Sequence, residues 1–177
     1  MATLTEALFL RVLGPAFDTL PGEVRRLHLA RGARRYDGEV EVERGSGVLA
    51  RLMAAATRLP PAGHGAVTVE MEADATRERW VRHIGGRAMP SRLWGARGLL
   101  CERLGLVTLG FRLEARDGEL HWRVARAAAL GLPLPAAWFA GVSAREYAQG
   151  GRYHFDVRAA MPLAGLLVHY HGWLHVD

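Results

Sequence analysis

The stretch LVTLGFRLEARDGELHWRV, residues 106–124, decides the fold class. Apolar side chains alternate with polar ones on both sides of Asp117-Gly118. The alternating apolar residues are Val107, Leu109, Phe111, Leu113, Leu120, Trp122 and Val124. A period of two is typical of a strand with one buried face, and Asp-Gly is a preferred pair for a tight hairpin turn. The sequence therefore predicts an antiparallel β-hairpin here.

The same period extends outward from this hairpin. It recurs in residues 36–44, 66–72 and 77–86, and residues 143–176 supply at least two more strands. After residue 66 there is no regular alternation of strands with helices, which argues against a parallel sheet. We expect an antiparallel meander of roughly eight strands that curls into a barrel or half-barrel and so hides its edges.

Helical spacing is found mainly before residue 66. Residues 5–20 form one helical segment, with Thr5 as a possible N-cap, that Gly14-Pro15 interrupts, and a short helix follows Pro21. In residues 45–61 Ser46 is the expected N-cap, and Pro60-Pro61 end the helix. Its expected buried stripe is Val48, Leu49, Leu52, Met53 and Ala56. The predicted fold is α+β, a single domain over residues 1–177, with N-terminal helices packed on the curved sheet.

Composition excludes several kinds of chemistry. The 23 basic residues are all arginine, and the chain has no lysine or asparagine, so a Schiff base, a Walker-type lysine and N-glycosylation are ruled out. The one cysteine, Cys101, lies among aliphatic residues and is expected to be a packed thiol. The arginines are dispersed, which argues against a nucleic-acid partner. The apolar runs are too short to span a membrane, and the N-terminus does not resemble a signal peptide, so a cytoplasmic location is expected.

A glycine-rich segment and the serines do not indicate a known active site. GSGVLA, residues 45–50, matches the dinucleotide-binding pattern, but the strand before it is EVEVE, polar on one face, whereas the first strand of such a unit is buried on both. We interpret the segment as a turn that opens a helix. Ser46, Ser91 and Ser143 lack the context of a nucleophile. We expect no bound cofactor.

Four residues near the C-terminus form a candidate metal site. If MPLA, residues 161–164, is the loop of a hairpin, His171 lies opposite His154 and His169 opposite Asp156. Three imidazoles and a carboxylate suit zinc or another divalent ion. Against this hypothesis, the other face of both strands is apolar and must form the core, and neighbouring arginines on the histidine face would repel a cation.

The inward faces of the predicted strands are rich in large aromatic side chains. These are Trp80, Phe111, Trp122, Tyr153, Phe155 and Tyr170. A closed barrel of this size either fills with such side chains or holds one apolar ligand. The six residues are therefore the candidate ligand-binding set, and the tyrosine and tryptophan polar atoms would need partners when buried.

Several segments together resemble a bacterial family known only as a domain of unknown function. That domain often lies C-terminal to saccharopine-dehydrogenase-like NAD(P)-binding domains. The segments are LFLRVLGPAFDTLPGEVRRLH, VERGSGVLARLMAAATRLPPAG, ERWVRHIGGR, GLPLP, REY, GRYHFDV and PLAGLLVHYHGWL. The resemblance implies no known activity. It implies that the domain functions together with a separately encoded NAD(P)-dependent oxidoreductase. In the family the positions of His169 and His171 are commonly basic, which weakens the metal hypothesis.

Three functional hypotheses follow. The first is a module that binds a small apolar molecule, lipid-like or polyketide-like, as an accessory to an oxidoreductase. The second is a metal-dependent enzyme that uses the histidine patch, and the third is a structural protein–protein interaction domain. The sequence leaves open whether the protein is an enzyme.

Overall fold

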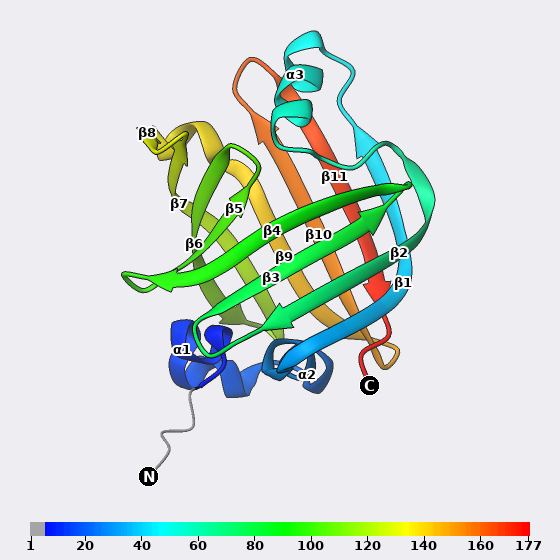
Figure 1. Cartoon of the computed structure of the whole chain (residues 1–177), viewed down its shortest axis with the longest axis vertical. Helices are drawn as coiled ribbons and strands as arrows, with labels where there is room; N and C mark the ends of the chain where they lie inside the picture. Colours follow the sequence, from blue (N-terminus) through cyan, green and yellow to red (C-terminus); the bar gives the residue numbers. More distant parts are fainter. Residues whose placement is uncertain (1–5) are drawn as a thin grey trace.

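The computed structural model describes residues 6–177 and shows a closed antiparallel β-barrel (Figure 1). Within these residues ten strands form the barrel wall. They are β1 (Gly32–Arg44), β2 (Gly63–Ala73), β3 (Arg77–Ile84), β4 (Arg87–Ala96), β5 (Leu99–Leu104), β6 (Val107–Arg116), β7 (Glu119–Ala129), β9 (Gly141–Gln149), β10 (Arg152–Met161) and β11 (Gly165–Leu174). An eleventh strand, β8 (Leu132–Leu134), pairs only with β7. The barrel closes where β1 pairs with β11 and where β6 pairs with β7.

The two ends of the barrel differ. One end, which we call the floor, is covered by α1 (Leu8–Leu13), the 3₁₀ helix η1 (Gly14–Thr19) and α2 (Gly22–Leu29). The other end, which we call the mouth, is formed by α3 (Val48–Ala56), β8, the 3₁₀ helix η2 (Ala136–Phe139) and the turns at residues 85–86, 105–106, 130–131 and 162–164. Because the strands alternate in direction, all of these segments meet at the same edge of the wall.

The predicted antiparallel barrel is confirmed, but the strand number is wrong. The hairpin of β6 and β7 turns at Asp117 and Gly118, whose φ angles of 54° and 76° are those of a tight hairpin turn. The prediction of roughly eight strands missed β4 and β5. Pro90 and Gly95 interrupt the alternating pattern in β4, and β5 has only six residues, so neither looked like a strand.

The helices differ from the prediction in three respects. The N-terminal helices cover an end of the barrel and are not packed along the face of a sheet, and the N-cap predicted at Thr5 lies outside the described residues. Helix α3 begins at Val48 after Gly47, and Ser46 makes no cap hydrogen bond. The expected buried stripe of α3 is largely exposed, because the helix lies against the barrel through Ala50 and Ala54. Small side chains let its backbone approach the wall, and the larger apolar residues point away.

Apolar side chains fill the floor. Phe9, Phe17, Val24 and Leu27 are almost completely inaccessible to solvent. The ring of Phe9 stacks on His28 with 3.6 Å between ring centroids and lies 5.5 Å from the ring of Trp122. This packing seals one end of the barrel and leaves the mouth as the end through which the interior can be reached.

Candidate functional site

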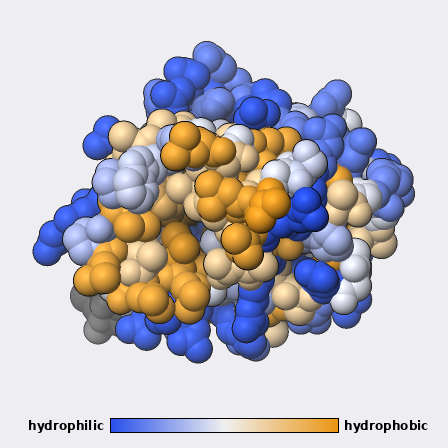
Figure 2. Space-filling view, turned by 90° about the horizontal axis from the view of Figure 1, so that it is seen from above, coloured by the Kyte–Doolittle hydropathy of each residue, from blue (hydrophilic) through white to orange (hydrophobic). Residues whose placement is uncertain are grey.

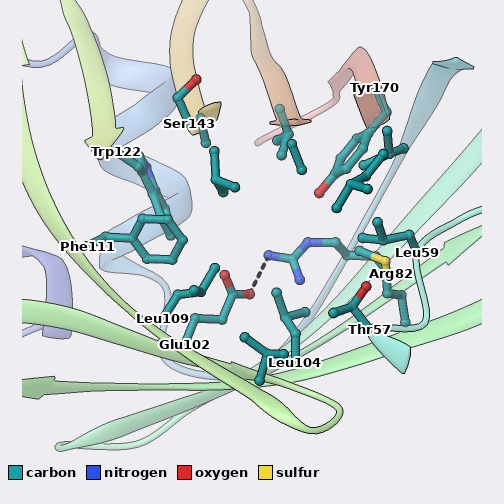
Figure 3. A pocket seen from close by; sticks show the side chains of 18 of the residues that line it. Thr57, Leu59, Arg82, Glu102, Leu104, Leu109, Phe111, Trp122, Ser143 and Tyr170 are labelled. Carbon is teal, nitrogen blue, oxygen red and sulfur yellow. Dashed lines mark hydrogen bonds and ion pairs between the residues drawn. The ribbon is translucent and has the colours of Figure 1, made fainter. Parts of the chain in front are cut away.

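A cavity of about 330 Å³ occupies the barrel interior (Figure 3). All six residues of the predicted ligand-binding set lie on its wall, and all are buried. They come from β3, β6, β7, β10 and β11, so the wall depends on the closed barrel and not on any one hairpin. Its volume falls within the range of small-molecule sites.

Ring contacts order this aromatic wall. Trp122 meets Phe111 edge to face at 5.3 Å between centroids, and Phe155 lies 6.1 Å from Tyr170 and 6.4 Å from Tyr153. Such geometries are favourable for aromatic pairs. The indole N–H of Trp122 is buried and has no hydrogen-bond partner among residues 6–177. A ligand oxygen could accept that hydrogen bond.

A buried ion pair lies in the cavity and was missed from the sequence. The Arg82 guanidinium lies 3.1 Å from Glu102, measured from Nη2 to Oε1, and donates through Nη1 to the hydroxyl of Ser91 at 3.0 Å. Figure 3 shows the pair among the apolar lining, with the Tyr170 hydroxyl turned toward the cavity. A signal existed, because the alternation that places Trp80 inside the barrel also places Arg82 there.

The polar groups of the cavity have a defined charge state. Burial lowers the pKa of Arg82, but the neighbouring Glu102 more than compensates, and the net pKa is raised. Burial raises the pKa of Tyr170, and it raises that of Tyr153 strongly with help from Glu146. The cavity therefore presents the compensated pair of Arg82 and Glu102 and two neutral phenols, and the carboxyl of Glu146, which contacts His28, also lies on its wall.

A second polar cluster lies between the cavity and the floor. His28 Nε2 is 2.6 Å from Glu146 Oε2, and the indole N–H of Trp80 donates to Glu78 at 2.8 Å. Burial raises the pKa of the Glu78 carboxyl, an effect that His28 partly offsets. Glu146 also lines the cavity. These groups hold the aromatic wall in place from below.

We expect Glu78→Gln to stabilise the protein at neutral pH but not in acid. Because the folded pKa is raised, the folded protein holds this proton more tightly than the unfolded chain, so ionisation of Glu78 opposes folding. That cost is absent below the ordinary carboxyl pKa of 4.5, grows as pH rises toward the folded pKa, and is constant above it. Glutamine removes the charge and keeps an acceptor for Trp80. Urea unfolding across this pH range measures the difference, and exposed Glu72→Gln is the control. A difference in unfolding free energy between Glu78→Gln and wild type that does not grow with pH would contradict a raised pKa for Glu78 in the folded protein.

The predicted metal residues lie on the outer face of β10 and β11, but their predicted register is wrong by two residues. Asp156 faces His171, and His154 faces Trp173. The turn occupies three residues, 162–164, and the register shifts between Ala159 and Ala160, so each contributes one residue of the difference.

Three of the four predicted metal residues lie together, but only His169 and Asp156 are hydrogen-bonded. His169 Nε2 lies 2.8 Å from Asp156 Oδ1, and the ring of His171 lies 5.4 Å from that of His169, with its Nε2 3.8 Å from Glu41. The ring of His154 stacks on Tyr147 instead. Within residues 6–177 no group of three His, Cys, Asp or Glu side chains is placed to hold a metal ion.

The surroundings of His169 and Asp156 are basic. Both line a hollow of about 310 Å³ on the barrel wall together with Arg123, Arg145 and Arg158. Arginines disfavour a bound cation. The metal hypothesis stays a prediction, which elemental analysis of the purified protein at neutral pH would test.

The remaining motifs have ordinary surroundings. β1, which precedes GSGVLA, is antiparallel to both of its neighbours, unlike the parallel strands of a dinucleotide-binding unit. Burial raises the pKa of Cys101, partly offset by Arg126, so the thiol is not activated. Ser91 is a partner of Arg82, and Ser143 lies at the cavity wall.

Comparisons with known proteins identify a family but no activity. The sequence model "Domain of unknown function (DUF4166)" matches residues 20–174. The comparison with curated proteins gave no match. A solved structure assigned as a thioesterase II from Thermobifida fusca YX is similar at 9% identity and a TM-score of 0.25, over 81% of this chain and 79% of that one. Within the part of the chain that the structure describes, no helix is long and apolar enough to cross a membrane.

Proposed function

The chain belongs to the DUF4166 family, and from its cavity we propose that it binds one small, largely apolar molecule. The observation that carries the proposal is an aromatic-lined space of about 330 Å³ with a buried ion pair in it. A protein interior normally packs without large voids, so a cavity of this size is costly unless a ligand occupies it. Antiparallel barrels commonly place their ligands in this way.

The ligand should carry a neutral polar group. The charges of Arg82 and Glu102 compensate each other, so a ligand carboxylate would add a negative charge to the cavity without a free cation opposite it. Burying an unpaired charge is far more costly than burying a hydrogen-bonded neutral group. Arg82 has further N–H donors, and Trp122 has an unpaired one. A hydroxyl or carbonyl oxygen fits these donors, and an aliphatic or polyketide-like body fits the aromatic wall.

We expect the delipidated protein to bind one long-chain primary alcohol per chain. At neutral pH it should bind the fatty acid of the same length at least about tenfold more weakly, because the carboxylate would be buried unpaired. Native mass spectrometry gives the stoichiometry, and displacement of an environment-sensitive dye gives the affinities. Preference for the fatty acid would overturn the proposed ligand class, and binding of neither, nor of any lipid from the host, would overturn the proposed function.

A pair of neighbouring variants places the ligand inside the barrel. Leu104 lines the cavity (Figure 3), whereas Arg103 is exposed on the outside of the same strand. Leu104→Trp should fill the space and abolish binding, and Arg103→Trp should leave the affinity within about twofold of wild type. Equal effects of the two changes would contradict an interior site.

The resemblance adds a partner to this proposal. We propose that an NAD(P)-dependent oxidoreductase receives the bound molecule. The test is whether such an enzyme from the same host reduces or oxidises the cargo faster in the presence of the loaded protein than with free cargo.

A further inference from the structure

Exposed large apolar side chains gather at the mouth. Of the nine large hydrophobic residues that are exposed within residues 6–177, eight lie there and only Leu29 lies at the floor. The eight are Val48, Leu49, Leu52, Leu106, Leu130, Leu132, Trp138 and Leu163. Figure 2 looks onto the mouth and shows apolar surface gathered there, with hydrophilic residues around it. Gathered exposed apolar surface marks an interaction site. We name these eight residues the apolar rim.

Two rim residues have no structural reason to be leucine. Leu130 and Leu163 lie at turn tips with left-handed φ angles of 51° and 66°, and Leu163 is 100% exposed. Glycine and asparagine favour this backbone conformation, whereas a bulky side chain is strained in it. A leucine that is both strained and largely or fully exposed, as these two are, suggests a role outside the fold.

The charges at the mouth are predominantly positive. The segments that form it, with the strand ends that lead into it, are residues 43–62, 84–88, 103–108, 126–141 and 158–166. They contain seven arginines and one acidic residue, Glu43, which lies level with Arg158 on the other side of His169. Six of the arginines are exposed: Arg51, Arg58, Arg87, Arg103, Arg126 and Arg158. The floor end instead carries acidic residues such as Asp18, Glu23, Asp74 and Asp117.

The rim borders the cavity. Met53 of α3 lines the cavity, and Trp138 both lines it and is 48% exposed. The floor is sealed by buried side chains of α1 and α2. A surface that meets the rim therefore meets the accessible end of the cavity.

We propose that the mouth docks on an anionic phospholipid bilayer, with the apolar rim at the level of the headgroups and the six arginines on the lipid phosphates. Leucine and tryptophan at separate loop tips can each insert into a fluid interface, where tryptophan is favoured. Arginines beside them are attracted to anionic lipid. The docking proposal depends only on the exposed residues of the mouth. Exchange of a bound ligand with the bilayer through the mouth rests in addition on the proposed function.

The charge pattern favours a bilayer over a second copy of the chain. A symmetric dimer through the mouth would oppose two sets of six exposed arginines with only one glutamate, Glu43, on each side to offset them. Like charges at an interface are unfavourable. An anionic lipid surface complements both the charge and the apolar tips.

Vesicle flotation tests the docking on the whole chain of residues 1–177. We expect binding to vesicles of phosphatidylcholine mixed with phosphatidylglycerol, and about tenfold weaker binding to phosphatidylcholine alone or in high salt. Leu163→Asp should weaken binding to the mixed vesicles at least about tenfold, because it places a charge at the interface. Aspartate tolerates the left-handed backbone at this position, so the variant should fold. The matched control is Leu29→Asp at the floor, which should bind as wild type does.

A second pair of variants tests the charge. Arg103→Gln at the mouth should weaken binding several-fold, and exposed Arg97→Gln in the floor turn 97–98 should not. The proposal is overturned if the mixed vesicles are not bound, if floor and mouth variants behave alike, or if sedimentation shows a dimer that Leu163→Asp dissociates. Alcohol binding without vesicles should be unchanged in Leu163→Asp, so failure of docking is distinguishable from failure of the ligand proposal.

Discussion

Glu102→Leu alone is expected to destabilise the protein by roughly 3–5 kcal/mol, because it leaves the Arg82 guanidinium buried in the cavity without its counter-charge. The side chain of Glu102 is buried and that of Arg82 is 13% exposed, so water replaces the lost carboxylate only in part. The double change Arg82→Met with Glu102→Leu removes both charges and keeps similar volumes. Its free energy of unfolding should lie within about 1–2 kcal/mol of wild type.

The double variant separates the stability of the barrel from ligand binding. If Arg82 holds the polar group of the ligand, the double variant should be folded and should bind the long-chain alcohol at least about tenfold more weakly. Urea unfolding followed by tryptophan fluorescence measures the free energy of unfolding, and dye displacement measures the affinity for the alcohol. A double variant as unstable as Glu102→Leu would contradict the account of the pair, and wild-type affinity would show that Arg82 does not contact the ligand.

The aromatic wall was predictable from the sequence because it depends on a local property. Whether Phe155 points inward is decided by alternation along its own strand, and apolar neighbours on both sides identify the buried face. The same holds for the other five residues, all of which lie on the cavity wall. Once the barrel closes, the inward side chains of five strands face the same interior, so the set can be predicted without knowing which strands pair.

The pairing of specific polar groups was harder to predict. Arg82 and Glu102 lie on β3 and β5 with β4 between them, and β4 was not recognised as a strand. The predicted register of the hairpin that carries His154 and His169 was wrong for a related reason. An Ala-Ala pair in β10 takes the register shift without disturbing the apolar pattern, so nothing in the sequence marked the bulge.

The helix over the mouth was predicted in place but not in orientation. Its large apolar residues were taken for the core face, since a soluble helix usually buries its apolar stripe. In the structure Ala50 and Ala54 are buried, while Val48 and Leu52 face outward. A rule for isolated globular domains fails where a surface is adapted to a partner, which is the reason to look for one at the mouth.

Phe9→Ala is expected to cost roughly 3–5 kcal/mol of unfolding free energy, because it empties a fully buried aromatic site. Phe9 covers His28 and lies against Trp122, so its loss also exposes the His28–Glu146 contact to water. Phe9→Leu refills most of the volume and should recover more than half of the loss. Leu29→Ala, at an exposed position of the same end, should change stability by no more than about 0.5 kcal/mol.

Stability and affinity should respond differently to this change. Phe9 does not line the cavity, so folded Phe9→Ala should bind the alcohol within a few-fold of wild type even though far less of it survives in urea. Urea titrations of the three variants, with affinities measured without denaturant, give both quantities. Stability of Phe9→Ala within about 1 kcal/mol of wild type would show that the floor relaxes around the gap. A large loss of affinity in the folded variant would show that ligand reaches the floor and that the two ends of the barrel do not have separate roles.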